Sequence, residues 1–300
     1  MRLFEVHLAC IALVVIDLVA RTWRFQWILR GMRFDVPFGE VLTLNVVGDA
    51  ASAITPLRAG GEPARLGALA HARVPLAAGV VAILIEIFVM WPVIIMAAGW
   101  LALIYAPRWW RAAEPQLAHT AAAAWPWVAG FMALGVLAWF ASRRAFPNVS
   151  QHMRRGTRRA FAYGRRMPAW PLLAGIPLTL ASLAARVAIL PVLALSLPHP
   201  PPLGPLSFAS FTLLYGQLLL PTPSGAGVVE IGFLGGAVGA LGGRHAVLLL
   251  YWRIYTTFVL VALGVLLGLR VYGREAIAAM MRGRAAVPRT DARDDGRGPT

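Results

Sequence analysis

The chain has 300 residues, of which 59% are hydrophobic and only 14% are charged, and its formal net charge is +15. A soluble domain carries about 25% charged residues, so the composition excludes an ordinary soluble domain and predicts a multi-pass membrane protein. The one cysteine, Cys10, excludes an intramolecular disulfide and a cysteine-based metal site. The six histidines show no metal-binding spacing, so we expect neither a metal nor another cofactor.

Apolar segments follow one another along most of the chain, and a bilayer-spanning helix needs about 20 such residues. They lie near 3–20, 38–56, 75–105, 122–142, 170–198, 206–242 and 245–271. We therefore predict an all-α integral membrane protein, a multi-pass helical bundle in one transmembrane domain, 1–272. The remaining residues, 273–300, are expected to form a disordered cytoplasmic tail.

The connections differ in arginine content, which indicates the side on which each lies. The connection 143–169 holds eight arginines, and the tail after residue 270 is also arginine-rich. Both are therefore predicted to be cytoplasmic, in a cell membrane, either plasma or inner. The connections 21–36 and 57–74 are arginine-rich as well. They hold Arg21, Arg24, Arg30 and Arg33, and Arg58, Arg65 and Arg73, respectively.

Both of these connections lie on the cytoplasmic side only if segment 38–56 enters the membrane and returns to the side it came from. The same assignment of sides by arginine content, applied to the second half of the chain, requires segment 206–242 to enter the membrane from the outside and to return to the outside. Backbone broken at membrane depth is tolerated where it lies within protein or lines a wet cavity. Two such hairpins of opposite orientation are typical of inverted-repeat transporters.

The two predicted re-entrant segments carry a similar phrase. Residues 55–62 read TPLRAGGE and residues 222–230 read TPSGAGVVE. We interpret them as two broken re-entrant hairpins in an inverted repeat, with halves of about 1–142 and 170–272 joined by the basic loop 143–169. The alternative is a chance match, because glycine and proline are common in membrane helices.

Each phrase is expected to end at the start of a helix, where exposed N–H groups and the helix dipole favour anions. In GGEPAR, proline favours the first helical turn, with Glu62 near the cap and Arg65 in the first turn. The residues of the two phrases that we expect to bind substrate or couple its movement are Arg58, Gly60, Gly61, Glu62, Arg65, Pro223, Ser224, Gly225, Gly227 and Glu230. Alternatively, both glutamates only cap their helices.

Three charged residues, Glu86, Arg186 and Arg253, lie well inside apolar segments. Each costs about 2.5–3.5 kcal/mol at the bilayer centre, so such residues normally face the protein interior and are paired. A purely structural ion pair is the alternative to a functional role. We expect Arg253 to pair with a carboxylate, and the candidates are Glu86, Glu62 and Glu230. Two acids nearer predicted ends or breaks, Asp17 and Asp49, are less informative.

The segments GGEPARLGALAHARVP, LPTPSGAGVVE and LLLYWRIYTTFVLVALG resemble motifs of the lysylphosphatidylglycerol synthase transmembrane, or flippase-like, family. The resemblance covers most of 3–272 and implies a protein that moves lipids or lipid-linked precursors between leaflets. Carried over by motif, the functional positions would be Gly60, Gly61, Glu62, Arg65, Pro223, Gly225, Gly227, Glu230 and Arg253. One departure is that family members often have arginine directly after the span glutamate, whereas Ile87 follows Glu86 here.

The leading functional hypothesis is therefore a flippase-like lipid transporter whose substrate has an anionic phosphate headgroup. We expect membrane lipids as partners, together with a separate lipid-modifying enzyme, and no nucleic acid. The sequence holds no nucleotide-binding loop, and a soluble synthase domain is absent, so we do not expect an enzyme. The alternative is a membrane subunit or enzyme of lipid-linked glycan or aminoacyl-phospholipid assembly, which would need Glu62 or Glu230 as a catalytic acid. A third hypothesis is a scaffold that anchors partners.

Overall fold

The computed structural model describes residues 3–55, 58–105, 167–217 and 245–273, and in these ranges every regular element is a helix. The helices are α1 (Leu3–Gly31), α2 (Phe38–Ile54), α3 (Gly61–His71), the helix Leu76–Tyr105, α6 (Trp170–Ala194), α7 (Leu203–Gly216), α9 (His245–Arg253), η6 (Ile254–Phe258), α10 (Val259–Gly268) and η7 (Leu269–Gly273). The predicted all-helical class is confirmed.

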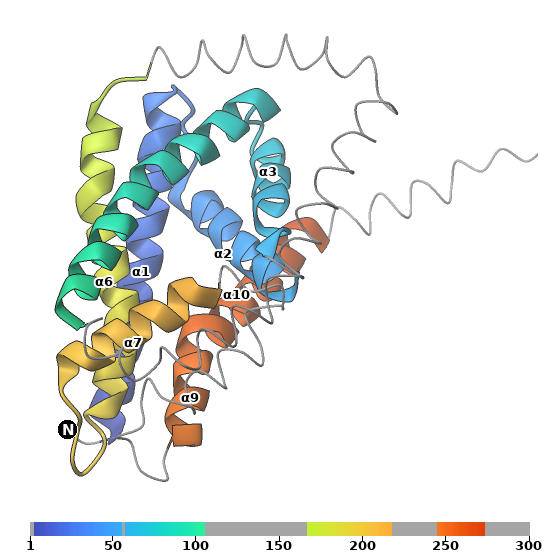
Figure 1. Cartoon of the computed structure of the whole chain (residues 1–300). Helices are drawn as coiled ribbons and strands as arrows, with labels where there is room; N and C mark the ends of the chain where they lie inside the picture. Colours follow the sequence, from blue (N-terminus) through green and yellow to red (C-terminus); the bar gives the residue numbers. More distant parts are fainter. Residues whose placement is uncertain (1–2, 56–57, 106–166, 218–244, 274–300) are drawn as a thin grey trace, which may run out of the picture.

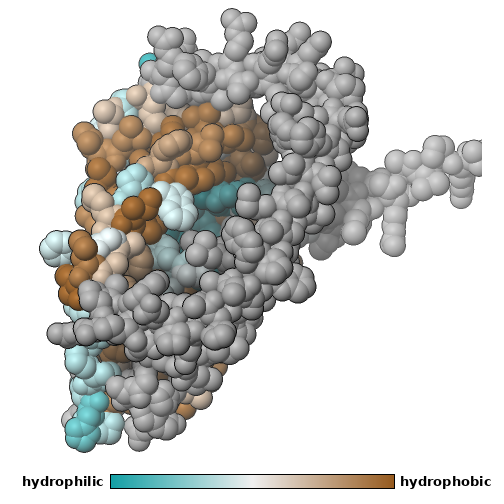
Figure 2. All heavy atoms as spheres, viewed as in Figure 1, coloured by the Kyte–Doolittle hydropathy of each residue, from teal (hydrophilic) through white to brown (hydrophobic). Residues whose placement is uncertain are grey.

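Four of these stretches are long and apolar enough to cross a membrane: Leu3–Gly31, Leu76–Tyr105, Trp170–Ala194 and Ala246–Gly268. They correspond to four of the predicted segments, so the protein is a multi-pass membrane protein. Large apolar side chains face outward, as a lipid-facing surface requires. Figure 2 shows them as a brown surface, and Phe4, Phe88 and Leu103 are each more than three-quarters exposed.

The first helix differs from the prediction, which ended the segment at residue 20. α1 continues without a break to Gly31, so Arg21 and Arg24 lie inside the helix and are not loop charges. The helix ends where Phe34 N donates to the Leu29 carbonyl, with the intervening backbone turning through a left-handed residue. The error arose because hydropathy counts every arginine as polar, whatever its partner.

The phrase TPLRAGGE forms a break between two helices, as predicted. α2 ends at Ile54 and α3 begins at Gly61. Figure 1 shows the end of α1 and the start of the helix Leu76–Tyr105 at the same, upper end of the molecule, with α3 running back toward it. This arrangement agrees with a segment that enters and returns.

Glycines allow the two arms of this hairpin to approach closely. A Cβ atom added to Gly61 would lie 2.0 Å from the Ser52 Oγ, and one added to Gly48 would lie 2.5 Å from the Arg65 Cγ. These glycines therefore bring α2 and α3 into direct backbone contact. A glycine also lets α10 pack closely against α2. A Cβ atom added to Gly264 of α10 would lie 2.2 Å from a backbone carbonyl oxygen of α2.

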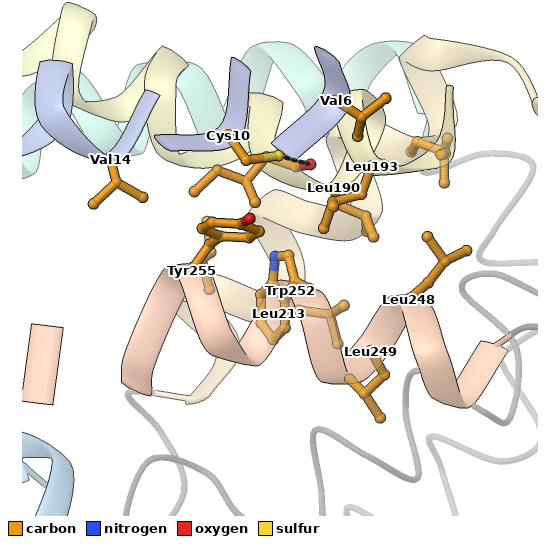
Figure 3. Packing of buried hydrophobic residues seen from close by; sticks show 14 of the residues in the cluster. Val6, Cys10, Val14, Leu190, Leu193, Leu213, Leu248, Leu249, Trp252 and Tyr255 are labelled. Atoms are coloured by element: carbon orange, nitrogen blue, oxygen red, sulfur yellow. Dashed lines mark hydrogen bonds between the residues drawn. The ribbon is translucent and has the colours of Figure 1, made fainter. Parts of the chain in front are cut away.

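The second predicted hairpin is described only over α7, and 218–244 and 122–142 lie outside the described residues. The inverted repeat and its halves therefore stay a prediction. Among the described helices, α2 packs against α1, α3 and α10, and α1 and α6 lie side by side (Figure 1). Figure 3 shows their shared apolar core, where Val6, Cys10 and Val14 of α1 meet side chains of α6, α7, α9 and η6.

Candidate functional site

A polar stripe runs along one face of α1. Asp17, Arg21 and Arg24 follow at intervals of four and three residues, which places them on one side of a helix. Asp17 lies at the midpoint of α1, and Asp17 and Arg24 are each only 2% exposed. Unpaired charges this deep in a membrane protein are costly, so their partners determine whether the helix can hold them.

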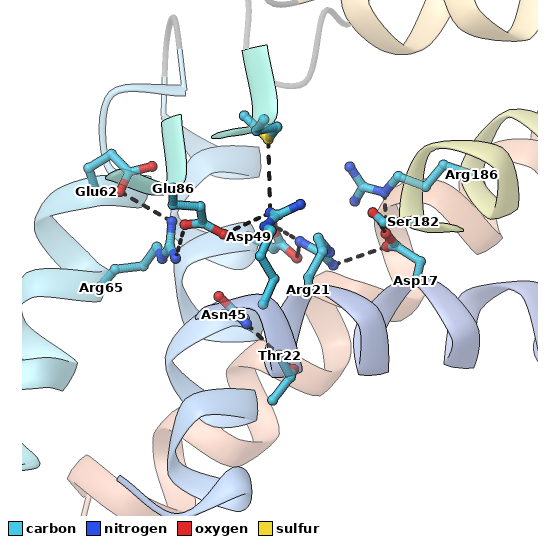
Figure 4. Close-up of polar contacts among 12 residues, drawn as sticks. Asp17, Arg21, Thr22, Asn45, Asp49, Glu62, Arg65, Glu86, Ser182 and Arg186 are labelled. Carbon is cyan, nitrogen blue, oxygen red and sulfur yellow. Dashed lines mark hydrogen bonds and ion pairs between the residues drawn. The ribbon is translucent and has the colours of Figure 1, made fainter. Parts of the chain in front are cut away.

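Asp17 binds groups from its own helix and from α6. The Arg186 Nε donates to its carboxylate at 2.9 Å and the Ser182 Oγ at 2.6 Å. Arg21, one turn along α1, lies 3.2 Å away. Arg21 also reaches α2, where its Nη1 binds both oxygens of Asp49 at 2.8 and 3.1 Å. Figure 4 shows this chain of contacts joining three helices.

A second cluster forms around Glu86, which is 5% exposed. The Arg24 Nη2 donates to one carboxylate oxygen at 2.7 Å, and Arg65 binds the other. Arg65 also approaches Glu62 at 3.4 Å and lies over the ring of Phe25, 4.4 Å from its centroid. The resemblance left open how Glu86 is neutralised when isoleucine follows it. In this chain, arginines from α1 and α3 neutralise it.

A cavity of about 300 Å³ lies between α1, α2, α3, the helix Leu76–Tyr105, α6 and α7. Its charged lining residues are Arg21, Arg24, Arg58, Arg65, Arg186, Asp49, Glu62 and Glu86. Its uncharged polar lining residues are Asn45, Ser52, Thr179, Ser182, Tyr215 and Gln217. In Figure 2 hydrophilic residues lie in a hollow below the apolar outer surface. A cavity of this size holds a ligand headgroup and not whole acyl chains.

Several predicted site residues come together at this cavity. Arg58, Gly61, Glu62, Arg65, Glu86 and Arg186 all line it. Gly60 instead donates its backbone N–H to the Thr55 Oγ1 at 2.9 Å within the break. Glu62 lies in the first turn of α3, as predicted, and its side chain is half exposed. Burial raises the pKa of the Glu62 carboxyl above its ordinary value, with Arg65 opposing this and Glu86 adding to it.

The remaining predicted residues are elsewhere. Pro223, Ser224, Gly225, Gly227 and Glu230 lie outside the described residues. Arg253 is buried at the end of α9, with its Cζ 5.7 Å from the centroid of the Trp252 ring, and it does not line the cavity. Of the acids named as its partners, Glu86 is bound by two other arginines, so a carboxylate partner for Arg253 stays a prediction.

Sequence reasoning gave no binding role to the residues that connect the network. Asp17 and Asp49 were set aside, and Arg21 and Arg24 were assigned to a loop, yet these four join α1 to α2, α6 and the helix Leu76–Tyr105. The available signal was the spacing of Asp17 and Arg21, a pair four residues apart at the end of an apolar run.

The comparisons place the chain in a family. The family model described as the lysylphosphatidylglycerol synthase TM region matches residues 2–264. No curated protein and no solved structure matches the chain. Because the match covers most of the chain, the protein belongs to this family, and its role is related to membrane lipids.

Proposed function

We propose that this member of the lysylphosphatidylglycerol synthase TM region family moves a lipid, or a lipid-linked precursor, between the two leaflets of the bilayer. The observation that carries the proposal is the polar cavity of about 300 Å³ placed among apolar spanning helices. A headgroup resists crossing the hydrocarbon because its polar groups lose their hydrogen bonds to water. Polar side chains within the bundle replace some of those bonds.

The charges of the cavity favour an anionic headgroup. Five arginines line it against three carboxylates, and Asp17 behind the wall adds a fourth acid. One positive charge is therefore in excess, and a phosphodiester carries one negative charge. The outward apolar surface would leave the acyl chains of such a lipid in the bilayer. The proposal assigns this chain no bond-making step, and its Arg-rich loop 143–169 and tail would lie on the cytoplasmic side.

The proposal is tested by reconstituting the purified protein into vesicles that contain a trace of phosphatidylglycerol or, in parallel vesicles, of zwitterionic phosphatidylcholine. Each lipid carries nitrobenzoxadiazole on an acyl chain, a fluorophore that dithionite reduces to a non-fluorescent product. Dithionite added outside removes fluorescence from the outer leaflet only. Vesicles with the protein should lose nearly all of the signal, whereas protein-free vesicles should lose only the outer-leaflet half. Loss of the same half with and without protein, for both anionic and zwitterionic lipids, would contradict the proposal.

A further inference from the structure

Arg58 differs from the other arginines of the cavity. Each of the other four contacts a carboxylate, whereas Arg58 forms no ion pair with any residue that the structure describes. It lies in the break between α2 and α3 with a φ of 57°, the left-handed region that residues other than glycine rarely adopt. Burial lowers the pKa of Arg58, and the nearby Arg186 and Arg21 lower it further, against Asp49.

Arg186 has donors that its carboxylate partner does not use. Its Nε donates to Asp17, and its two terminal nitrogens make no hydrogen bond within the described part of the chain. Its side chain is 22% exposed, and Figure 4 shows the guanidinium extending past Asp17 and Ser182. A guanidinium that binds one carboxylate through Nε, and whose two terminal nitrogens have no partner among the described residues, is arranged to bind a second anion.

Arg58 and Arg186 both line a second hollow as well as the large cavity. This smaller hollow, of about 20 Å³, also shares Asp49 with the large cavity. Its other polar wall residues are Gln217 and the threonines Thr256 and Thr257. The threonines belong to η6, a π-helical turn, and such turns often occur at functional sites. The junction of the hollows therefore combines two open guanidinium groups with neutral polar side chains and with the Asp49 carboxylate, whose two oxygens Arg21 already binds.

We infer that Arg58 and Arg186 together bind one phosphate or phosphodiester group at the junction of the two hollows. Of the arginines expected to bind substrate, Arg65 already contacts Glu62 and Glu86, so we assign the phosphate to Arg58, together with Arg186. The assignment of the group to a lipid rests on the proposed function. The binding of the anion itself does not depend on transport and is measured separately.

The test uses the full chain in an uncharged maltoside detergent at constant ionic strength. The shift in unfolding temperature is titrated with four probes: dihexanoylphosphatidylglycerol, dihexanoylphosphatidylcholine, dihexanoylglycerol, which lacks phosphate, and sodium phosphate. The wild type should bind both phosphodiesters and not dihexanoylglycerol. Arg58→Gln should weaken this binding by at least about tenfold, because it removes charge-assisted hydrogen bonds. Without a probe its unfolding temperature should be equal to that of the wild type or higher, since an unpaired charge is removed.

Arg73→Gln is the matched control, because Arg73 has a similar φ of 59° and is exposed outside the cavity. It should bind like the wild type, and Arg58→Lys should retain more binding than Arg58→Gln. A shift with sodium phosphate that depends on Arg58, without one for the lipids, assigns the site to a free anion. Equal shifts in the wild type and Arg58→Gln, or from dihexanoylglycerol, overturn the inference. Binding without leaflet exchange would overturn the transport proposal and keep the anion site.

Discussion

Replacing Glu86 by glutamine should cost much of the stability of the bundle. The substitution keeps the shape of the side chain and removes the charge that Arg24 and Arg65 share. Arg24 is 2% exposed, so water does not replace its lost partner. Breaking a buried ion pair by removing one partner costs about 3–5 kcal/mol, and we expect a loss of this order in the free energy of unfolding.

The assay is reversible unfolding in mixed detergent micelles with an increasing fraction of dodecyl sulfate. Glu62→Gln is the matched control, because Glu62 contacts the same Arg65 but is half exposed. Exposed pairs contribute about 0–1 kcal/mol. The double variant Arg24→Met, Glu86→Gln should lose less than the sum of its single variants, because the buried charge left unpaired is itself removed. If Glu86→Gln costs no more than Glu62→Gln, or if the single losses add, the buried network does not stabilise the fold as we argue.

The other predictions concern packing and topology. Gly264→Leu should lower the free energy of unfolding by about 1–3 kcal/mol or more, because α10 lies directly on the α2 backbone. The control is Gly67→Ala, which has open space around it and should be neutral or stabilising. Comparable losses for the two variants in the micelle assay would refute the close contact. In a Cys10→Ser background, single cysteines at exposed positions near Gly31 and His71 should both react with a membrane-impermeant maleimide from the cytoplasm. Reaction at His71 from the outside would instead show that α2 crosses the membrane.

The spanning helices could be predicted from the sequence because the local run of apolar residues decides them. The break at TPLRAGGE could be predicted for the same reason, since proline and glycine act on their own backbone. Glu62 is therefore in the first turn of α3, as expected from the proline that follows it. The corresponding phrase around Glu230 lies outside the described residues, so its structure stays a prediction.

The charged network could not be predicted because its contacts are not local. Asp17 and its partner Arg186 are separated by 169 residues, and Arg24 and Glu86 by 62. A hydropathy scale assigns each of these residues a cost without knowing its partner, so the prediction ended the first helix before Arg21. Only the fold shows that these charges neutralise one another within the bundle, and that Arg58 has no such partner among the described residues.

Blocking the cavity tests most directly whether lipid headgroups pass through it. Met90 lines the cavity and its sulfur lies 4.0 Å from the Arg24 Nη2, whereas Phe88, on the same helix, is 76% exposed. In a Cys10→Ser background, Met90→Cys and Phe88→Cys are modified in detergent with maleimides of increasing size, whose thioether bond dithionite does not reduce. The modified proteins are then reconstituted, and leaflet exchange is followed with dithionite. The account predicts that exchange falls with reagent size at position 90 and not at position 88. Equal exchange at both positions, with complete modification, would contradict it.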